Sequence, residues 1–132
     1  MALFQVHAVL MAAGFLCFGA AAFVAATKRS QKWWLRVHRV AGLSGTVLML
    51  CGAAMAAAAI ILSGESHFRT PHSWIGALTV AGAVAAPVLG FLQFRIRNRL
   101  QTVRAAHRWC GRLLTASALI AILLGLRLAG LI

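Results

Sequence analysis

Acidic side chains are almost absent from this sequence, which has 13 Lys and Arg residues against a single acid, Glu65. One carboxylate forms neither the pair that acid/base hydrolysis uses nor the oxygen cage that holds calcium. The three cysteines, Cys17, Cys51 and Cys110, lie apart in apolar stretches and form no CxxC motif. The sequence therefore excludes most hydrolase chemistry, a disulfide framework and a thiolate metal site.

The positive charge, +12 in total, would suit nucleic acid if it formed one basic face. Here the basic residues separate long apolar runs instead, and 62% of the residues are hydrophobic while only 11% are charged. An ordinary soluble domain is about one quarter charged. We therefore expect membrane lipid as the surrounding medium and no nucleic-acid partner.

Three uncharged runs, residues 1–27, 40–64 and 70–94, are each long enough to cross a bilayer, which takes about 20 residues. A fourth, 113–132, contains one charge, Arg127, which can reach the membrane surface from a helix end. The first run lacks the positive start of a signal peptide, so we count it as a helix of the protein. Because lipid favours helices and the connections are short, we predict an all-α integral membrane protein, a four-helix up-down transmembrane bundle. It forms one domain over residues 1–132, with helices at about 3–26, 36–62, 71–96 and 104–131.

Basic residues also predict the topology. Eleven of the 13 flank the first and third connections, whereas Arg69 and Arg127 lie toward the other face. Since cytoplasmic segments carry the excess of Lys and Arg, we expect both termini to be extracytoplasmic, in a multi-pass protein of a bacterial inner membrane. The eleven are Lys28, Arg29, Lys32, Arg36, Arg39, Arg95, Arg97, Arg99, Arg104, Arg108 and Arg112.

Four of the five histidines fall near the starts of the four expected helices. Because successive helices alternate in direction, His7 and His72 belong at one level, and His38 and His107 at the other. Two imidazoles that face each other across a bundle can be the axial ligands of a haem iron. The sequence therefore predicts two bis-histidine haem sites, one near each membrane surface.

Small and basic residues accompany these histidines. Arg39 and Arg108 directly follow His38 and His107, where they can compensate the carboxylates of a haem. Glycine follows three of the histidines at i+4, on the same helix face, and leaves room for a flat macrocycle. These glycines are Gly42, Gly76 and Gly111.

A single intramembrane histidine is as easily explained by a hydrogen bond to a neighbouring helix. His67 lies in the second connection, where a solvated or interfacial side chain is the simpler interpretation. The other four favour haem ligation, because a purely structural role would have to explain their levels, their spacing and the glycine placement independently.

Together, these motifs resemble the cytochrome b561 family, in particular the four-helix core shared with ferric reductase transmembrane domains. The resemblance implies two non-covalent b-type haems, with His7 paired to His72 and His38 to His107, and electron transfer across the membrane. The motifs are His7-Ala8-Val9-Leu10-Met11, His38-Arg39 with Gly42, His67-Phe68-x-x-Pro71-His72-Ser73-Trp74-x-Gly76, and His107-Arg108-x-x-Gly111.

Because bis-histidine ligation fills both axial positions, a substrate should meet the haem edge, and Arg39, Arg108 and Arg69 are the candidates for that surface. Donor and acceptor remain open among a quinol, ascorbate, a ferric chelate, a soluble cytochrome and a partner subunit, and so does a ferric reductase activity. A homodimer and a subunit of a larger complex are both compatible with the sequence.

Two interpretations from other classes stand beside this one. The first is a helical membrane anchor or assembly subunit of a redox complex, in which the histidines bind no haem and only make interhelical hydrogen bonds. The second is a small transition-metal transporter, which ranks last because no carboxylate lines its path. Bound chromophore and metal content separate them from a di-haem cytochrome.

Overall fold

The computed structural model describes residues 2–132 and contains four long helices joined by short connections. All four are long and apolar enough to cross a membrane. No strand occurs among residues 2–132, so the expected all-α transmembrane class is confirmed. The helices are α1 (Ala2–Thr27), α2 (Trp34–Ser63), α3 (Pro71–Arg95) and α4 (Leu100–Leu128).

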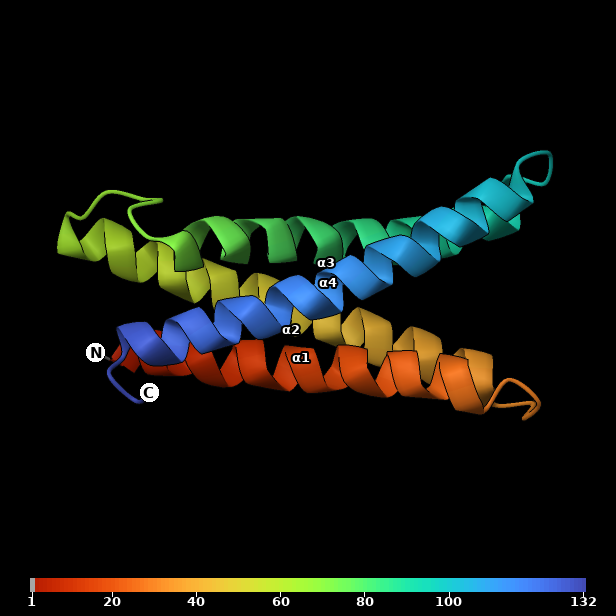
Figure 1. The fold of residues 1–132 in the computed structure, drawn as a ribbon, viewed down its shortest axis with the longest axis horizontal. Helices are drawn as coiled ribbons and strands as arrows, with labels where there is room; N and C mark the ends of the chain where they lie inside the picture. The colour runs from red at the N-terminus through yellow and green to blue at the C-terminus, as the bar shows by residue number, and fades with distance from the viewer. Residues whose placement is uncertain (1) are drawn as a thin grey trace.

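The chain runs up and down, as Figure 1 shows. Both termini and the α2–α3 connection, residues 64–70, lie together at what we call the terminal end. The α1–α2 and α3–α4 connections, residues 28–33 and 96–99, lie at the opposite end. We call this the basic end, because eleven of the 13 Lys and Arg residues lie in or beside these two connections.

Local chemistry defines where α3 begins. Thr70 is its N-cap and accepts a hydrogen bond from the backbone N–H of Ser73, while the Ser73 side chain accepts one from Thr70. Pro71 occupies the first turn, where a backbone N–H would have no partner within the helix, so its missing N–H costs no hydrogen bond. This capping box places His72 in the first turn of α3.

The bounds of α4 differ from the expected 104–131 at both ends. The helix begins at Leu100, because the turn already closes with the bond from Val103 N–H to the Arg99 carbonyl. It ends at Leu128, because Gly130 adopts φ 69° and the N–H of Leu131 bonds back to Leu126 in a Schellman motif.

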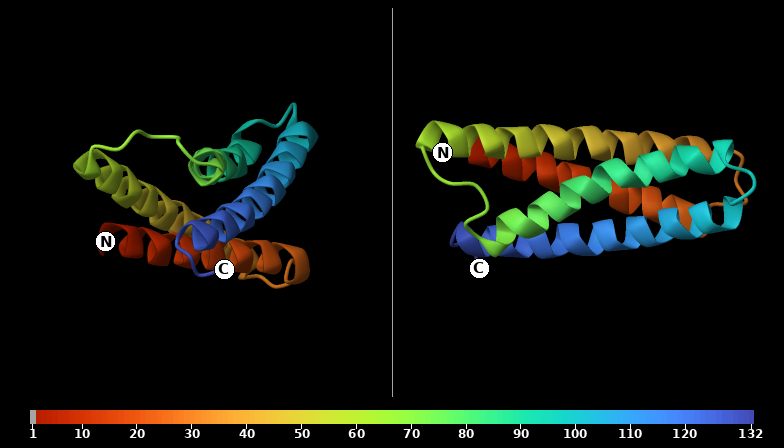
Figure 2. Two further views of the ribbon diagram at one scale, coloured as in Figure 1. Left: turned by 60° about the vertical axis from the view of Figure 1, so that its left-hand side comes forward. Right: turned by 90° about the horizontal axis from the view of Figure 1, so that it is seen from above.

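The bundle is built from two hairpins, hairpin 1 (α1 and α2) and hairpin 2 (α3 and α4), drawn from two further directions in Figure 2. Within residues 2–132, close backbone approaches between helices lie mostly within a hairpin, fewer join α2 to α3 or α1 to α4, and none joins α1 to α3 or α2 to α4. The last two pairs are therefore the diagonals of the bundle.

The hairpins meet at mid-height. The hydroxyl of Thr46 on α2 donates to the carbonyl of Ala83 on α3 at 2.8 Å. That carbonyl is free because Pro87, one turn later, has no N–H to donate to it. Around this contact lies a small core drawn from all four helices: Phe18, Met49, Ala83, Ala86, Leu114 and Ala118.

Candidate functional site

The four histidines of the helix starts come together as two pairs across the diagonals. At the terminal end, the ring centroids of His7 and His72 lie 6.1 Å apart with the ring planes at 90°. At the basic end, His38 and His107 lie 5.9 Å apart with the planes at 87°. Each pair joins one histidine of hairpin 1 to one of hairpin 2.

Each imidazole is oriented by a hydrogen bond from Nδ1 to a backbone carbonyl of the other helix in its own hairpin. Because a carbonyl only accepts, Nδ1 carries the hydrogen, and in the neutral ring Nε2 keeps its lone pair. The contacts are His7 to Gly52 at 2.8 Å, and His38 to Ala21, His72 to Ala121 and His107 to Ala86, each at 2.9 Å.

The acceptors follow a common spacing. In every helix the accepting residue lies 14 positions after that helix's histidine, as Ala21 follows His7 on α1 and Ala121 follows His107 on α4. A separation of 14 residues is close to four helical turns, so both positions lie on nearly the same face, about 21 Å apart. The two histidine levels are therefore about this far apart along the bundle.

The three predicted glycines lie beside open space. Gly42, Gly76 and Gly111 are half-buried, yet no heavy atom lies within 4 Å of the position where a Cβ would stand on any of them. On α1 the corresponding residue is Met11, which packs against Gly52 of the same hairpin. Three of the four helices thus have open space one turn after the histidine, where the sequence predicts room for a large flat group.

These arrangements fit a b-type haem. An imidazole nitrogen binds a metal at about 2.0 Å, and the ring centroid lies about 1 Å beyond that nitrogen. The centroids of two imidazoles on opposite sides of one metal are therefore about 6 Å apart. The observed separations are 6.1 and 5.9 Å. Within residues 2–132, no group of three His, Cys, Asp or Glu side chains could hold a metal ion. The histidines instead form pairs, which suit the two axial positions of a haem iron.

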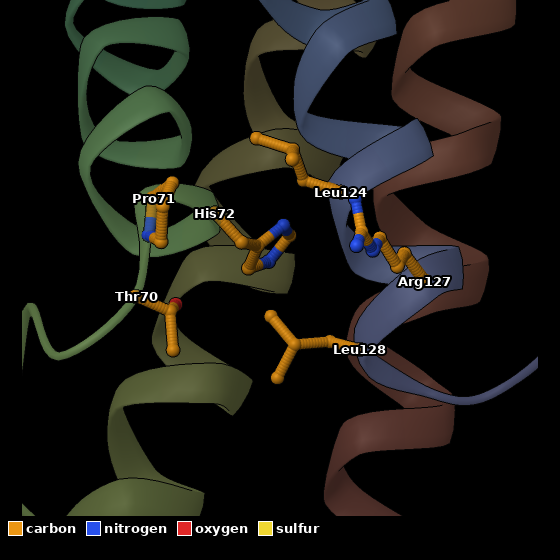
Figure 3. A pocket seen from close by; sticks show the side chains of 6 residues that line it. All are labelled: Thr70, Pro71, His72, Leu124, Arg127 and Leu128. Carbon is orange, nitrogen blue, oxygen red and sulfur yellow. The ribbon is translucent and has the colours of Figure 1, made fainter.

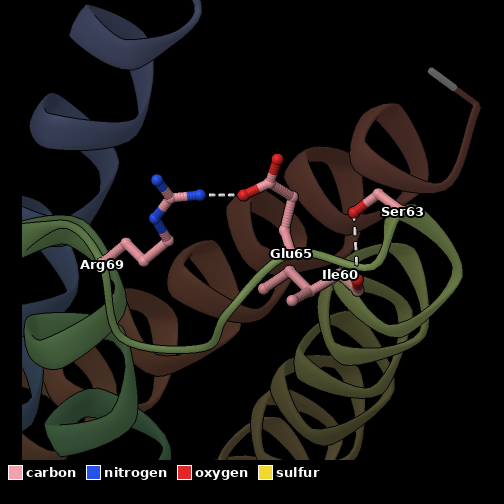
Figure 4. A network of polar contacts seen from close by, with 4 residues as sticks. All are labelled: Ile60, Ser63, Glu65 and Arg69. Atoms are coloured by element: carbon pink, nitrogen blue, oxygen red, sulfur yellow. Dashed lines mark hydrogen bonds and ion pairs between the residues drawn. The ribbon is translucent and has the colours of Figure 1, made fainter.

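The predicted arginines occupy different surroundings. The guanidinium of Arg39 lies 4.5 Å from the ring centroid of Phe94, across the α2–α3 contact. Arg108 is exposed beside His107. Arg69 forms an ion pair with Glu65 within the α2–α3 connection (Figure 4), so its charge is already partly neutralised.

A pocket of about 410 Å³ opens beside His72 at the terminal end (Figure 3). The residues that line it are Thr70, Pro71, His72, Leu124, Arg127 and Leu128. Arg127 is the one cation among them, whereas its sequence position predicts only that it reaches the membrane surface from a helix end. The side chain of Arg127 therefore lines the same pocket as a predicted haem ligand.

Other neighbours of the imidazoles were also missed. Trp34 lies one turn before His38, with ring centroids 6.1 Å apart. On α3 and α4, a Cβ at Gly90 or Gly125 would stand 3.3 or 3.0 Å from the imidazole of His107 or His72. The common spacing of 14 residues could have indicated the acceptors, but alanine is so frequent in this chain that the spacing alone is weak.

His67 is not part of either pair. It is exposed in the α2–α3 connection beside Phe68, a non-glycine residue with φ 61°. The indole N–H of Trp74 donates to the Phe68 carbonyl at 3.1 Å, and the two aromatic rings lie 4.7 Å apart. These contacts order the connection at the terminal end.

The fold and the opposed histidine pairs define an integral-membrane helical bundle with the layout of a haem protein. The family model described as eukaryotic cytochrome b561 matches residues 6–131, which is nearly the whole chain. The chain belongs to the cytochrome b561 family, whose members are transmembrane electron-transfer proteins with b-type haem. Searches of curated proteins and of solved structures found no match.

Proposed function

We propose that this chain is a di-haem cytochrome that transfers electrons between the two faces of a membrane. His7 and His72 hold one b-type haem near the terminal end, and His38 and His107 hold the other near the basic end. The observation that carries the proposal is the opposition of two imidazoles at about 6 Å at each of the two levels.

The chain contributes orientation and charge. A bound haem supplies one-electron chemistry between ferrous and ferric iron. The carbonyls of Ala21, Gly52, Ala86 and Ala121 hold the four imidazoles in the tautomer that offers Nε2. Because histidine would occupy both axial positions of each haem, the sites would suit electron transfer rather than oxygen binding.

Cations lie near both haem sites. At the basic end, Arg39 and Arg108 follow the two histidines directly and are available to haem carboxylates. At the terminal end, Arg127 lines the pocket beside His72, and Arg69 is the further candidate, with Glu65 as its present partner. We assign the basic end to the cytoplasm of a bacterial cell, since it carries eleven of the 13 Lys and Arg residues.

Redox partners meet the protein at its two ends. The pocket at the terminal end combines an apolar wall with one hydroxyl and one guanidinium. This lining suits a small reductant or oxidant with an anionic or carbonyl oxygen, such as a quinol or ascorbate. At the basic end, the dense positive charge favours an anionic partner, such as a ferric chelate or an acidic protein surface.

Single histidine variants test the proposal. The purified protein should show a b-type spectrum on dithionite reduction, and potentiometric titration should resolve two components. His38→Ala should remove one component and His72→Ala the other, each leaving its counterpart in place. His67→Ala is the matched control, because His67 is exposed in a connection, and it should retain both.

A helical membrane anchor without haem is the second candidate, favoured by the hydrogen bond that every paired imidazole makes to a neighbouring helix. Those bonds alone would give interhelical stability. They do not require the rings to face each other across the diagonals. A colourless protein after expression with abundant haem would favour the anchor.

A further inference from the structure

Two glycines of hairpin 2 lie directly against the imidazoles. A Cβ built on Gly125 would stand 3.0 Å from Cε1 and 3.2 Å from Nδ1 of His72. A Cβ built on Gly90 would stand 3.3 Å from Cε1 and 3.6 Å from Nδ1 of His107. These glycines differ from Gly42, Gly76 and Gly111, which lie beside open space.

Both glycines stand in the same relation to the carbonyl that holds the ring. Gly125 follows Ala121 by four residues, and Gly90 follows Ala86 by four. Residues four apart lie one above the other on a helix face. Each imidazole of hairpin 2 therefore packs against one turn of the neighbouring helix. Its Nδ1 donates to the carbonyl of the alanine at the start of that turn, and its Cε1 lies against the glycine at the end of it.

Resting on the proposed function, we infer that Gly90 and Gly125 are positioning residues of the two haem sites. The missing side chain lets each imidazole lie close enough to the neighbouring helix to reach its carbonyl. The contact sets the ring plane and the position of Nε2, and with them the angle between the two axial rings.

The corresponding positions of hairpin 1 support a role specific to hairpin 2. The residues four after the acceptors Ala21 and Gly52 are Ala25 and Ala56, so both already carry a Cβ. The small residue is thus common to all four sites, while glycine occurs only where a Cβ would crowd the imidazole of His72 or His107. A methyl group there should tilt the ring, because the carbonyl belongs to a rigid helix.

Electron paramagnetic resonance of the oxidised, full-length holoprotein tests this inference, since the g values of a low-spin ferric haem depend on the angle between its axial imidazole planes. His38→Ala and His72→Ala assign one signal to each end. Gly125→Ala should shift or remove the terminal-end signal and leave the other unchanged. Gly90→Ala should shift the basic-end signal alone, and by less, because the contact it creates is longer.

Two further glycines serve as matched controls. Gly19→Ala places its methyl group in open space, and Gly82→Ala places it at an ordinary 3.4 Å from Leu114 in the interface of hairpin 2. Both variants should retain both signals at the wild-type g values.

Unchanged signals in Gly125→Ala and Gly90→Ala would overturn the inference, and so would an equal loss of both signals, which marks general loss of packing. If Gly125→Ala fails to accumulate, Gly90→Ala decides the matter alone, because its smaller displacement must still be selective. A wild-type protein without haem would instead refute the proposed function, so the two failures are distinguishable.

Discussion

Inside hairpin 1, α1 and α2 approach closely at Gly14 and Gly45, where an added Cβ would stand 3.1 Å from a backbone carbonyl of the other helix. Inside hairpin 2, Thr79 and Ser117 share a buried hydrogen bond of 3.0 Å. Between the hairpins, by contrast, the described residues make one hydrogen bond, from Thr46 to Ala83. The interface within a hairpin is therefore much closer than the interface between hairpins.

The histidines follow the same division. Each of the four paired imidazoles donates its hydrogen bond to a carbonyl of its own hairpin, yet it faces an imidazole of the other hairpin. Each hairpin thus presents half of two sites. In the proposed function, the two irons would join the hairpins where packing alone joins them weakly.

The largest effect should come from cutting one connection at a time. A protease site inserted after Glu65 separates hairpin 1 from hairpin 2 when cleaved, whereas a site after Arg29 cuts within hairpin 1. In the haem-loaded protein, the two fragments should remain associated after either cut. In the His38→Ala/His72→Ala variant, the cut after Glu65 should release two halves on size-exclusion chromatography in detergent, and the cut after Arg29 should not.

Halves that remain together without haem as firmly as with it would show that packing between the hairpins is sufficient. That result would contradict the proposal that haem ligation holds the two hairpins together, but it would not bear on the geometry of the two sites.

The interface within a hairpin should be sensitive to one methyl group. Gly45→Ala would bring a Cβ to 3.1 Å from the Gly14 carbonyl and 3.2 Å from the ring of Phe18. Overpacking of this kind costs about 1–3 kcal/mol. We expect a lower midpoint of thermal unfolding by circular dichroism, with Gly19→Ala close to the wild type; equal midpoints would contradict the close approach.

The interface between hairpins should respond less. Thr46→Val removes the hydrogen bond to Ala83 and leaves that carbonyl unpaired, because Pro87 offers no N–H. Interhelical bonds in membranes are worth about 1 kcal/mol. The midpoint should fall slightly, and adding Pro87→Ala should recover part of the loss by supplying a helical donor. No recovery in the double variant would contradict this account of Pro87.

The smallest effect should come from the α2–α3 connection. Arg69 and Glu65 form an exposed ion pair, which contributes at most about 1 kcal/mol. Arg69→Ala should therefore leave the unfolding midpoint nearly unchanged.

Arg127→Ala should weaken haem retention at the terminal end more than Arg69→Ala does, since Arg127 lines the pocket beside His72. The reverse order would restore Arg69 as the main partner of a haem carboxylate.

The first three helices could be predicted because charge is confined to their ends, whereas α4 carries Arg104, Arg108 and Arg112 along its first half. The long uncharged runs and the clusters of Lys and Arg mark the spans independently of packing. The bounds of α4 were harder to predict, because Arg104 lies inside its first turns, and a charged side chain at that place is also typical of a connection. The end at Leu128 depends on the positive φ of Gly130, in a run that is apolar on both sides.

The site could be predicted in part. Alternating helix direction was sufficient to sort His7 with His72 and His38 with His107, because level depends only on topology. The acceptor carbonyls could not be predicted, since every residue has one and only the contact between helices selects it. Gly90 and Gly125 were missed for the same reason, as each lies 18 residues, or about five turns, after the histidine of its own helix.

The ratio of haem to protein in the purified wild-type chain tests the central claim most directly. Two opposed imidazole pairs should hold two b-type haems per polypeptide, measured as the pyridine haemochrome against quantitative amino-acid analysis. A ratio near two is the predicted result. A ratio near one would contradict one of the two pairs, and a colourless protein would contradict both.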